Sequence, residues 1–341
     1  MEKITRRTLV KTMAAVPAGI GGFNILTSRA AQPEFKWKFG SVQPVSSPLV
    51  AQVQQLGPKL LEATGGRMTV QVFPNSQLGS ETDMLSQVRS GALEMFHGGV
   101  NILQGMNKQV SVYGMAFAFP DYDHVWQAMD GELGAYVRGI ISKLDLHTLD
   151  KMWDVGFRQI TTSSKPINTP DDLTGMKIRV PPSPMWTSLF QALGASPVSI
   201  NFPEVYTSLQ TRIADGQENP LWLIQAARYY EVQKYVSLTN HMWDGNFTII
   251  NAKAWRALPP ALQETVPRLF DEAVVKERED ARKLDQAAAE DLKKSGMIFN
   301  TVDIKPFREQ LSKAGYYKQW RETYGNDVWA VLEKFSGGPL D

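Results

Sequence analysis

The sequence of 341 residues contains no cysteine and only four histidines. Without cysteine the chain has no disulfide bond, no thiolate nucleophile and no thiolate metal ligand. His97, His124, His147 and His241 lie far apart, without the His-x-His or His-x3-His spacing of many metal sites. We therefore expect no metal ion, no cofactor and a core that packing alone stabilises.

Nucleotide-binding and catalytic patterns are also missing. The sequence has neither a GxGxxG pattern nor a phosphate-binding P-loop. Asp215 and Glu218 in DGQEN are close enough in sequence to suggest an acid/base pair. Their neighbours, however, predict a junction between a turn and a strand, which favours a structural role. We expect that the protein is not an enzyme.

No Gly/Ser-rich linker or internal repeat divides the chain. Its composition, 43% apolar and 21% charged, predicts well-packed cores, and its length is sufficient for two domains. The formal net charge is +1, but the first 31 residues hold five basic residues against one acidic residue, which leaves 31 basic and 34 acidic residues in the remainder. A slightly acidic protein of this kind is not expected to bind nucleic acid.

The first 31 residues have the pattern of an export signal. A basic stretch containing TRRTLVK precedes an apolar segment from Met13 to Leu26, and small residues follow up to Ala31. The apolar segment is shorter than the ~20 residues that a membrane-spanning helix needs. Arg6 and Arg7 resemble the pair of a twin-arginine signal, although ordinary secretory signals also contain adjacent arginines. We expect cleavage of residues 1–31 and a periplasmic location.

The N-terminal part after this signal predicts a β-α-β unit. FKWKFG (Phe35 to Gly40) and MTVQVF (Met68 to Phe73) have the pattern of strands, and Ser47 is placed to cap the helix between them. A second helix is expected from Glu81 to Ser90, followed by the short buried strand in LEMFHGG. This order predicts an α/β sheet whose strand ends carry ligand contacts.

The second half of the chain predicts another α/β sheet. Expected strands are Met152 to Arg158, MKIRV and PVSI, with a helix from Met185 to Leu193. FTIIN (Phe247 to Asn251) is predicted to return to the first sheet, and a long helix from Pro267 to Ser295 is predicted to touch both domains. The expected domains are therefore discontinuous: lobe I comprises residues 32–156 plus 245–284, and lobe II comprises 157–244 plus 285–341.

Two arginines at expected strand ends point to anion binding. Arg158 lies in GFRQITTS and Arg179 in GMKIRVPPSP, and IADGQENP places Asn219 after a further strand. A guanidinium group binds a carboxylate through two parallel hydrogen bonds, and an amide can satisfy its remaining lone pairs. A single buried arginine is more often a structural ion pair, but the combination of two arginines and an asparagine favours a carboxylate site.

Aromatic residues cluster near these arginines in the sequence. Trp186, Trp222 and Trp243 lie either in the cores, as most tryptophans do, or form a flat wall around a bulky acid. His97, before Gly98 and Gly99, is expected at a strand end where it can donate to a ligand hydroxyl. A buried histidine in the core is the alternative.

Several blocks of the sequence together resemble the substrate-binding subunit of tripartite ATP-independent periplasmic (TRAP) transporters, the DctP-type family. The resemblance covers most of the chain after the signal and is carried by GFRQ, TPDDLTGMKIRV, GASPVSINFPEVYTSLQ, DGQENP and YYEVQKYVSLTNH. It implies a two-lobed α/β periplasmic binding protein fold, in which each lobe is a sheet flanked by helices and the lobes are joined by hinge strands and a long strut helix.

The resemblance also implies ligand contacts and partners. Arg179 is expected to hold the ligand carboxylate, Arg158 to approach from a second strand, Asn219 to lie beside them and Phe202 to place its ring against the ligand. A small organic anion and the membrane permease of a TRAP transporter are the expected partners, and a monomer is the expected state.

Two departures from the sialic-acid branch of this family bear on the ligand. Pro182 replaces an asparagine of that branch, and Gly99 stands where the branch has a glutamate in its cleft. We therefore expect an aromatic or other bulky monocarboxylate rather than sialic acid, with a uronate, a C4-dicarboxylate or a keto acid as alternatives. A secreted enzyme acting on a carboxylated substrate and a ligand-sensing module are the alternatives from other classes.

Overall fold

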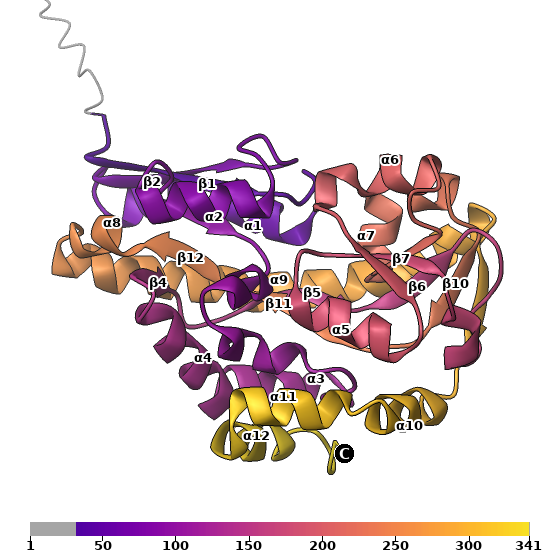
Figure 1. Ribbon diagram of the computed structural model, residues 1–341. Helices are drawn as coiled ribbons and strands as arrows, with labels where there is room; N and C mark the ends of the chain where they lie inside the picture. The colour runs from indigo at the N-terminus through magenta and orange to yellow at the C-terminus, as the bar shows by residue number, and fades with distance from the viewer. Residues whose placement is uncertain (1–31, 341) are drawn as a thin grey trace, which may run out of the picture. The chain divides into compact units, whose positions relative to one another are not determined.

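The computed structural model describes residues 32–340. The predicted export signal therefore lies outside the described residues. Residues from Pro33 onward form one unit that contains three β-sheets and the helices that cover them (Figure 1). Across residues 32–340, no helix combines the length and apolarity needed to cross a membrane.

The first sheet has the strand order β2-β1-β3-β12-β4. Strand β1 runs parallel to β2 and β3, whereas β12 runs antiparallel to β3 and β4. The Ser47 side chain caps helix α1 by accepting a bond of 3.3 Å from the Val50 N–H, and Gly91 ends helix α2 with φ +82°. The predicted β-α-β unit and the return of the chain at β12 are thus confirmed. The elements are β1 (Phe35–Ser41), α1 (Pro48–Ala63), β2 (Met68–Phe73), α2 (Glu81–Ser90), β3 (Met95–His97), β4 (Leu146–Thr148) and β12 (Thr248–Asn251).

The second sheet has the strand order β13-β10-β6-β9-β7-β8. Strand β7, which carries Arg179, pairs in parallel with β8 and β9. The helix after β7 agrees with the prediction to within one residue at each end. The elements are β6 (Gln159–Thr162), β7 (Lys177–Val180), α5 (Pro184–Ala192), β8 (Ser196–Ser199), α6 (Val205–Gln210), β9 (Gly216–Asn219), α7 (Leu221–Ala226), β10 (Tyr235–Leu238) and β13 (Ile298–Thr301).

Two antiparallel strands, β5 (Trp153–Phe157) and β11 (Trp243–Asn246), form a separate small sheet. Strand β5 follows β4 of the first sheet and precedes β6 of the second, and β11 follows β10 and precedes β12, so two of the three passages of the described chain between the large sheets run through this pair. The third passage, from β12 to β13, runs through the long helix from Pro260 to Lys294. The pairing shifts between Asp244 and Gly245, and Gly156 has φ +120°, a conformation that side chains with a Cβ rarely adopt.

Helix α9 (Pro260–Lys294) is the long predicted helix, but it begins seven residues before Pro267. Pro260 occupies the first turn, where a missing N–H costs nothing, and Pro267 lies inside the helix. The first half of α9 packs on α1, and its second half reaches α7 and another core through Ala288 and Leu292 (Figure 1). The prediction that this helix contacts both sheet regions is confirmed.

The C-terminal helices pack on elements from both halves of the sequence. Helix α11 contacts α5 and the short helix η2, and α12 contacts α4 and η2. The predicted lobe boundaries at residues 157, 245 and 285 stay a prediction. The remaining helices are η1 (Val100–Gly105), η2 (Lys108–Gly114), α3 (Tyr122–Met129), α4 (Glu132–Ser142), η3 (Pro170–Leu173), η4 (Phe202–Glu204), η5 (Tyr229–Glu231), α8 (Ala252–Arg256), α10 (Lys305–Lys313), α11 (Tyr316–Tyr324) and α12 (Asn326–Glu333).

Candidate ligand-binding site

A pocket lies between the two large sheets, beside the crossing strands. It encloses about 580 Å³ of empty space, including the part that opens to solvent. One side of the pocket is lined by residues that precede β4, in the region of the first sheet. A second side is lined by residues from β7 to α7, in the region of the second sheet, and a third side is lined by residues of β5 and β11. The lining comprises Val42, Gln43, Glu81, His97, Gly99, Ile102, Val155, Arg158, Arg179, Pro181, Pro182, Ser183, Trp186, Phe202, Asn219, Leu223, Asp244 and Asn246.

Arg179 is the lining residue with the most free hydrogen-bonding capacity. Its side chain is buried, and Nε and Nη2 donate to the carbonyl oxygen of Ile200 at 2.9 and 2.7 Å. Among the described residues, no carboxylate lies within ion-pair distance of this guanidinium. Burial lowers the pKa of Arg179, because the charge is removed from water without a direct counter-ion. The Nη1/Nη2 edge remains free to bind a planar anion through two hydrogen bonds.

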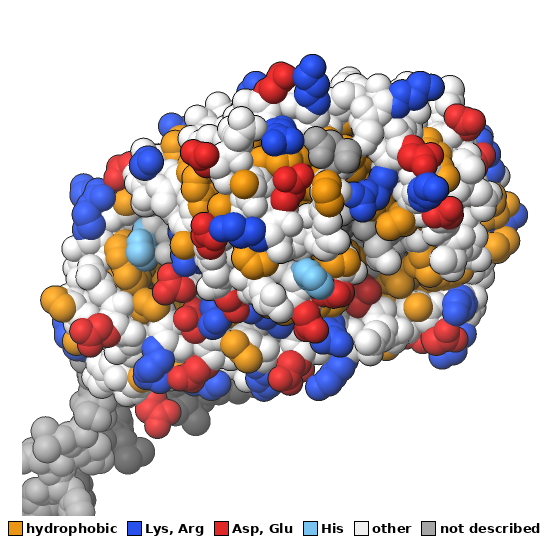
Figure 2. Space-filling model, turned by 90° about the horizontal axis from the view of Figure 1, so that it is seen from below, with side chains coloured by type: hydrophobic (Ala, Val, Ile, Leu, Met, Phe, Trp, Pro, Cys, Tyr) orange, Lys and Arg blue, Asp and Glu red, His pale blue; other side chains and the backbone are white. Residues whose placement is uncertain are grey.

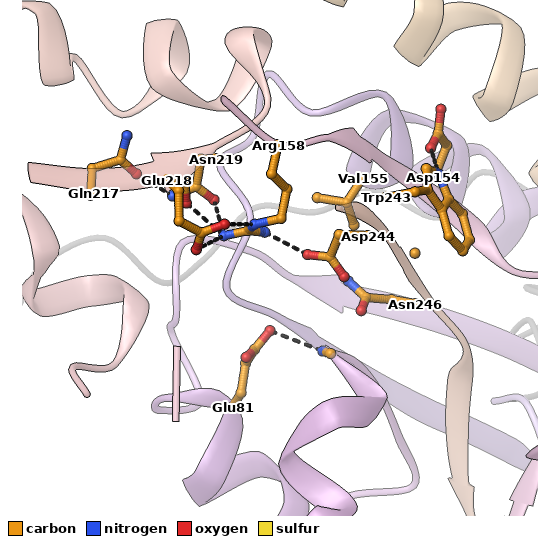
Figure 3. A network of polar contacts seen from close by, with 12 residues as sticks. Glu81, Asp154, Val155, Arg158, Gln217, Glu218, Asn219, Trp243, Asp244 and Asn246 are labelled. Carbon is orange, nitrogen blue, oxygen red and sulfur yellow. Dashed lines mark hydrogen bonds and ion pairs between the residues drawn. The ribbon is translucent and has the colours of Figure 1, made fainter. Parts of the chain in front are cut away.

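Arg158 also lines the pocket, but protein groups already bind all three of its nitrogens. Nε donates to the Glu218 carboxylate, Nη1 donates to Asp244 Oδ2 at 2.6 Å, and Nη2 donates to Glu218 Oε1 at 2.8 Å (Figure 3). Nη2 also lies 3.1 Å from Asn219 Oδ1. The structure thus places Arg158 in the buried ion pair that the sequence analysis weighed as the alternative, rather than as a second free anchor.

The pKa values of the two carboxyl groups that contact Arg158 are shifted in opposite directions. Burial raises the pKa of Glu218, but the cation of Arg158 and the hydrogen bond to His241 Nε2 at 3.1 Å outweigh it, so the pKa is lowered overall. Burial raises the pKa of Asp244 to about 6 despite its contact with Arg158, and the neighbouring Glu218 carboxylate adds to the rise. Glu218 therefore has the structural role that its sequence neighbours predicted.

Asn219 lies beside the arginines, as predicted. Its Oδ1 accepts from Arg158, and its Nδ2 donates to Gln217 Oε1 at 2.5 Å, which leaves one amide hydrogen free. Both bonds fix the amide plane at the edge of the pocket. Phe202 is half-buried and also lines the pocket.

Four lining residues carry buried polar atoms without a hydrogen-bond partner among the described residues: His97 Nδ1, Trp186 Nε1, Asp244 Oδ1 and Asn246 Oδ1. Buried polar atoms in folded proteins are almost always paired, so a group of unpaired ones around one pocket indicates that a polar ligand completes them. Burial lowers the pKa of His97 to about 3, so that its imidazole is neutral near pH 7. The other His97 nitrogen lies 3.1 Å from Asn246 Nδ2.

Trp186 lines the pocket, whereas Trp222 and Trp243 do not and follow the alternative of packing in the core. Both are buried, and their indole N–H groups bond within the protein: Trp222 donates to the Val155 carbonyl at 2.7 Å and Trp243 to Asp154 Oδ1 at 2.9 Å. The Trp243 ring packs against Tyr113, Phe119 and Trp126 in the core. These rings anchor the crossing strands, which explains why they cluster near the arginines in the sequence.

Sequence reasoning did not single out Gln43, Glu81, Ser183, Asp244 or Asn246, although all line the pocket. Glu81 is the first residue of α2 and its carboxylate oxygen Oε1 accepts a bond of 3.2 Å from the Gly99 N–H. Glu81 could have been recognised as a candidate from its position at the start of a predicted helix, directly after a strand and a turn. Asp244 and Asn246 lie two residues apart on β11, directly after Trp243, and no local motif marks them.

Within residues 32–340, no three histidine or acidic side chains are grouped in a way that could hold a metal ion. The α/β fold and a buried guanidinium without a carboxylate partner among the described residues, in a pocket between the two large sheets, suit the binding of a small anion. Residues 39–323 match the family model DctP, described as bacterial extracellular solute-binding protein, family 7. The chain belongs to this family, so the resemblance noted in the sequence is confirmed.

Known proteins resemble the chain over nearly its full length. The 2,3-diketo-L-gulonate-binding periplasmic protein YiaO of Escherichia coli is 31% identical over 93% of this chain and 94% of its own. A TRAP periplasmic solute-binding protein from Pseudomonas putida F1, solved with bound D-glucuronate, matches with 31% identity and a TM-score of 0.82, covering 88% of this chain and 96% of that one. Another from Sulfurospirillum deleyianum, with bound succinate, has 27% identity and a TM-score of 0.83, covering 90% of this chain and all of that one.

The two-lobed α/β fold of TRAP solute-binding proteins is therefore the fold of this chain. The similar proteins named above bind small organic acids, and the chain is a solute-binding protein by family.

Proposed function

We propose that the protein is the periplasmic receptor of a TRAP transporter for a hydroxylated organic acid of the uronate kind. The observation that carries this proposal is the free guanidinium edge of Arg179 in a pocket whose other walls hold unpaired polar atoms. A carboxylate matches the guanidinium, and hydroxyl groups match the remaining polar atoms. The D-glucuronate and 2,3-diketo-L-gulonate named for similar proteins support this ligand class over the aromatic acid expected from the sequence.

The carboxylate is held in three ways in this proposal. It accepts two parallel hydrogen bonds from Nη1 and Nη2 of Arg179, whose orientation is set by the bonds to the Ile200 carbonyl. The free amide hydrogen of Asn219 donates to a remaining lone pair. Arg158 does not touch the carboxylate but fixes Asn219 through the contact of Nη2 with Oδ1. Because the pocket excludes most water, these charged hydrogen bonds are stronger than in solution.

Ligand capture is coupled to closure of the pocket in this proposal. The walls come from both large sheets, and all covalent crossings at the pocket pass through β5 and β11. A ligand that bonds to both walls favours the closed arrangement by the free energy of contacts that exist only there. The two predicted lobes and their hinge at these strands belong to this part of the proposal, as does delivery to the permease.

The location and partners complete the proposal. We propose export by the twin-arginine pathway on the basis of Arg6 and Arg7, followed by release as a monomer into the periplasm. On the face drawn in Figure 2, basic and acidic side chains are interspersed without a large basic patch, which supports the expectation that nucleic acid is not a partner. Replacing both arginines with lysine and following the precursor in cells that lack the twin-arginine translocase tests the export route.

A thermal-shift screen followed by calorimetry tests the ligand class. Uronates, aldonates, C4-dicarboxylates, keto acids and aromatic acids are compared, since a ligand of the native state raises the melting temperature. We expect uronates or aldonates to bind with no product formed. Arg179→Ala should weaken binding by about 2 to 5 kcal/mol, and Arg179→Lys should recover little because the two-bond fork is lost.

Arg89→Ala is the matched control, since Arg89 is exposed on α2 and lies outside the pocket lining. It should bind like the wild type. Equal affinity of Arg179→Ala and the wild type for the acid would refute the proposed role of Arg179. Binding of aromatic acids alone would refute the ligand class.

A further inference from the structure

Glu81 gives the pocket a second charged end, of opposite sign to Arg179. It lies at the start of α2, and its Oε1 accepts the Gly99 N–H at 3.2 Å. Among the described residues, no lysine or arginine lies within ion-pair distance of it. Figure 3 shows Glu81 with its carboxylate directed toward the side on which Arg158, Asp244 and Asn246 lie, and all four residues line the same pocket.

The charges around the pocket do not cancel evenly. Arg158 contacts two acidic side chains, Glu218 and Asp244, so this cluster contains one more acidic than basic group. Arg179 and Glu81 also line the pocket, and neither has a direct counter-ion among the described residues. One carboxylate on the ligand compensates Arg179, whereas a second carboxylate would have to approach Glu81, Asp244 or both. Like charges in a pocket with little water repel strongly, so a second carboxylate is disfavoured.

The hydrogen-bonding character of this wall leads to the same conclusion. Glu81 presents carboxylate oxygens, and Asp244 Oδ1 and Asn246 Oδ1 are buried acceptors without partners among the described residues. Acceptors need donors. A hydroxyl group supplies a donor, whereas a carboxylate or a keto group supplies only further acceptors. The wall therefore matches a chain or ring of hydroxyls.

Solvent reaches part of Glu81, but protein atoms surround it closely. Burial raises the pKa of Glu81, and the carboxylate of Asp244 adds to the rise, while the Gly99 N–H and the two arginines oppose it. Apart from the Gly99 N–H, which Glu81 contacts directly, these groups act on Glu81 through space across the pocket.

We propose that Glu81 is a specificity-determining residue that accepts hydrogen bonds from the hydroxyl groups of the ligand and excludes a second carboxylate. This inference rests on the proposed function, because it takes Arg179 as the anchor of the first carboxylate. It narrows the ligand class to monocarboxylates that carry several hydroxyls and removes C4-dicarboxylates from the candidates.

Pairs of acids that differ only at the far end test this proposal. D-gluconate and D-glucarate form one pair, D-galactonate and galactarate a second, and D-erythronate and meso-tartrate a third. In each pair a terminal CH₂OH is replaced by a carboxylate. Isothermal titration calorimetry on the wild type should show at least tenfold tighter binding of the monocarboxylate in the pair that binds best, and succinate should bind weakly or not at all.

Glu81→Gln removes the charge but keeps an oxygen that can accept the Gly99 N–H, so the helix start is preserved. In this variant we expect the monocarboxylate to bind at most about threefold more tightly than its matching dicarboxylate, mainly because the dicarboxylate gains affinity. Glu62→Gln, at an exposed position of α1, is the matched control and should retain the wild-type ratio. A melting temperature of ligand-free Glu81→Gln close to that of the wild type verifies that it folds.

The outcomes separate this inference from the proposed function. A wild type that prefers the dicarboxylate, or a ratio that Glu81→Gln leaves unchanged, overturns the role of Glu81 while Arg179-dependent binding still supports the receptor. If no hydroxylated acid binds, or binding is independent of Arg179, the proposed function fails and this inference fails with it.

Discussion

At the residue scale, the two arginines of the pocket have opposite electrostatic surroundings. Arg158 is held by Glu218 and Asp244, whereas Arg179 bonds only to the uncharged carbonyl of Ile200. The sequence showed two arginines in similar positions and did not distinguish them. The two carboxylates that hold Arg158 come from β9 and β11 and are 60 and 86 residues away from it in the sequence. The functional difference between them is therefore a tertiary property.

This difference predicts distinct effects on stability in the absence of ligand. Arg158→Ala leaves two buried carboxylates without their cation and should lower the free energy of unfolding by about 3 to 5 kcal/mol. Arg179→Ala removes a buried charge that has no counter-ion and should cost clearly less. Chemical denaturation of both variants measures the two losses.

The milder Arg158→Lys keeps the charge but loses the two-bond contact, and it provides a measurement if Arg158→Ala does not fold. The free energy of unfolding of Arg158→Lys should lie between those of the wild type and Arg158→Ala. Equal losses for Arg158→Ala and Arg179→Ala would contradict the assignment of Arg158 to a structural ion pair.

At the element scale, helix α9 holds the crossing strand β5 through acidic and basic side chains. Glu277 accepts the backbone N–H of Asp154 at 3.0 Å, and Arg278 donates to the Met152 carbonyl at 3.0 Å. Asp154 in turn accepts from Trp243 on β11, which joins both crossing strands to the helix. Burial raises the pKa of Asp154 to about 7, although the hydrogen bonds with Trp243 and Tyr122 oppose the rise.

A pH-dependent stability follows from this raised pKa. Between pH 4 and pH 7 the folded protein holds the Asp154 proton more strongly than the unfolded chain, so the free energy of unfolding falls as pH rises through this range. Asp154→Asn cannot ionise. The difference in free energy of unfolding between this variant and the wild type should therefore shift in favour of the variant by on the order of 2 kcal/mol between pH 5 and pH 8.

Urea denaturation at several pH values measures this change. Glu279→Gln, an exposed position on the same helix, should follow the pH profile of the wild type. The raised pKa values of Glu277, Asp285 and Asp244 add to the wild-type slope, so Asp154→Asn should reduce the slope without removing it. A slope that does not change in Asp154→Asn would show that Asp154 is already ionised at pH 5.

At the scale of the whole molecule, side chains meet across the mouth of the pocket. Thr82 Oγ1 on α2 lies 3.4 Å from Asn201 Oδ1, which directly precedes η4. These residues are 119 positions apart and belong to the regions of the first and second sheets. Their contact marks the arrangement that closure around a ligand would produce.

Because the chain has no cysteine, a pair introduced at these positions reports on closure directly. In Thr82→Cys combined with Asn201→Cys, we expect a uronate or aldonate that binds to speed up disulfide formation several-fold, since the ligand favours the closed arrangement. Non-reducing gel electrophoresis over time measures the rate. Lys59→Cys with Glu62→Cys, both within α1, should cross-link at a rate that the ligand does not affect. Ligand-independent rates for both pairs would contradict closure.

The sequence by itself determined the elements that depend on local patterns. The β-α-β start, the Ser47 cap, the return strand β12 and the family all followed from residues that are close together in the chain. Periodicity and capping act within a few residues, so a single sequence displays them. The start of α9 was predicted seven residues too late, at Pro267. Proline is favoured in the first turn of a helix, and both Pro260 and Pro267 fit that position in the sequence, but the helix begins at Pro260.

Only the tertiary structure decided which side chains meet in the pocket. It assigned Arg158 to Glu218 and Asp244, moved Trp222 and Trp243 into the packing around the crossing strands, and brought Glu81 opposite Arg179. Each of these outcomes depends on which strand ends become neighbours after the chain has passed back and forth between the sheets. Charge neutralisation and burial are set by these neighbours, and they distinguish an anchoring arginine from a structural one.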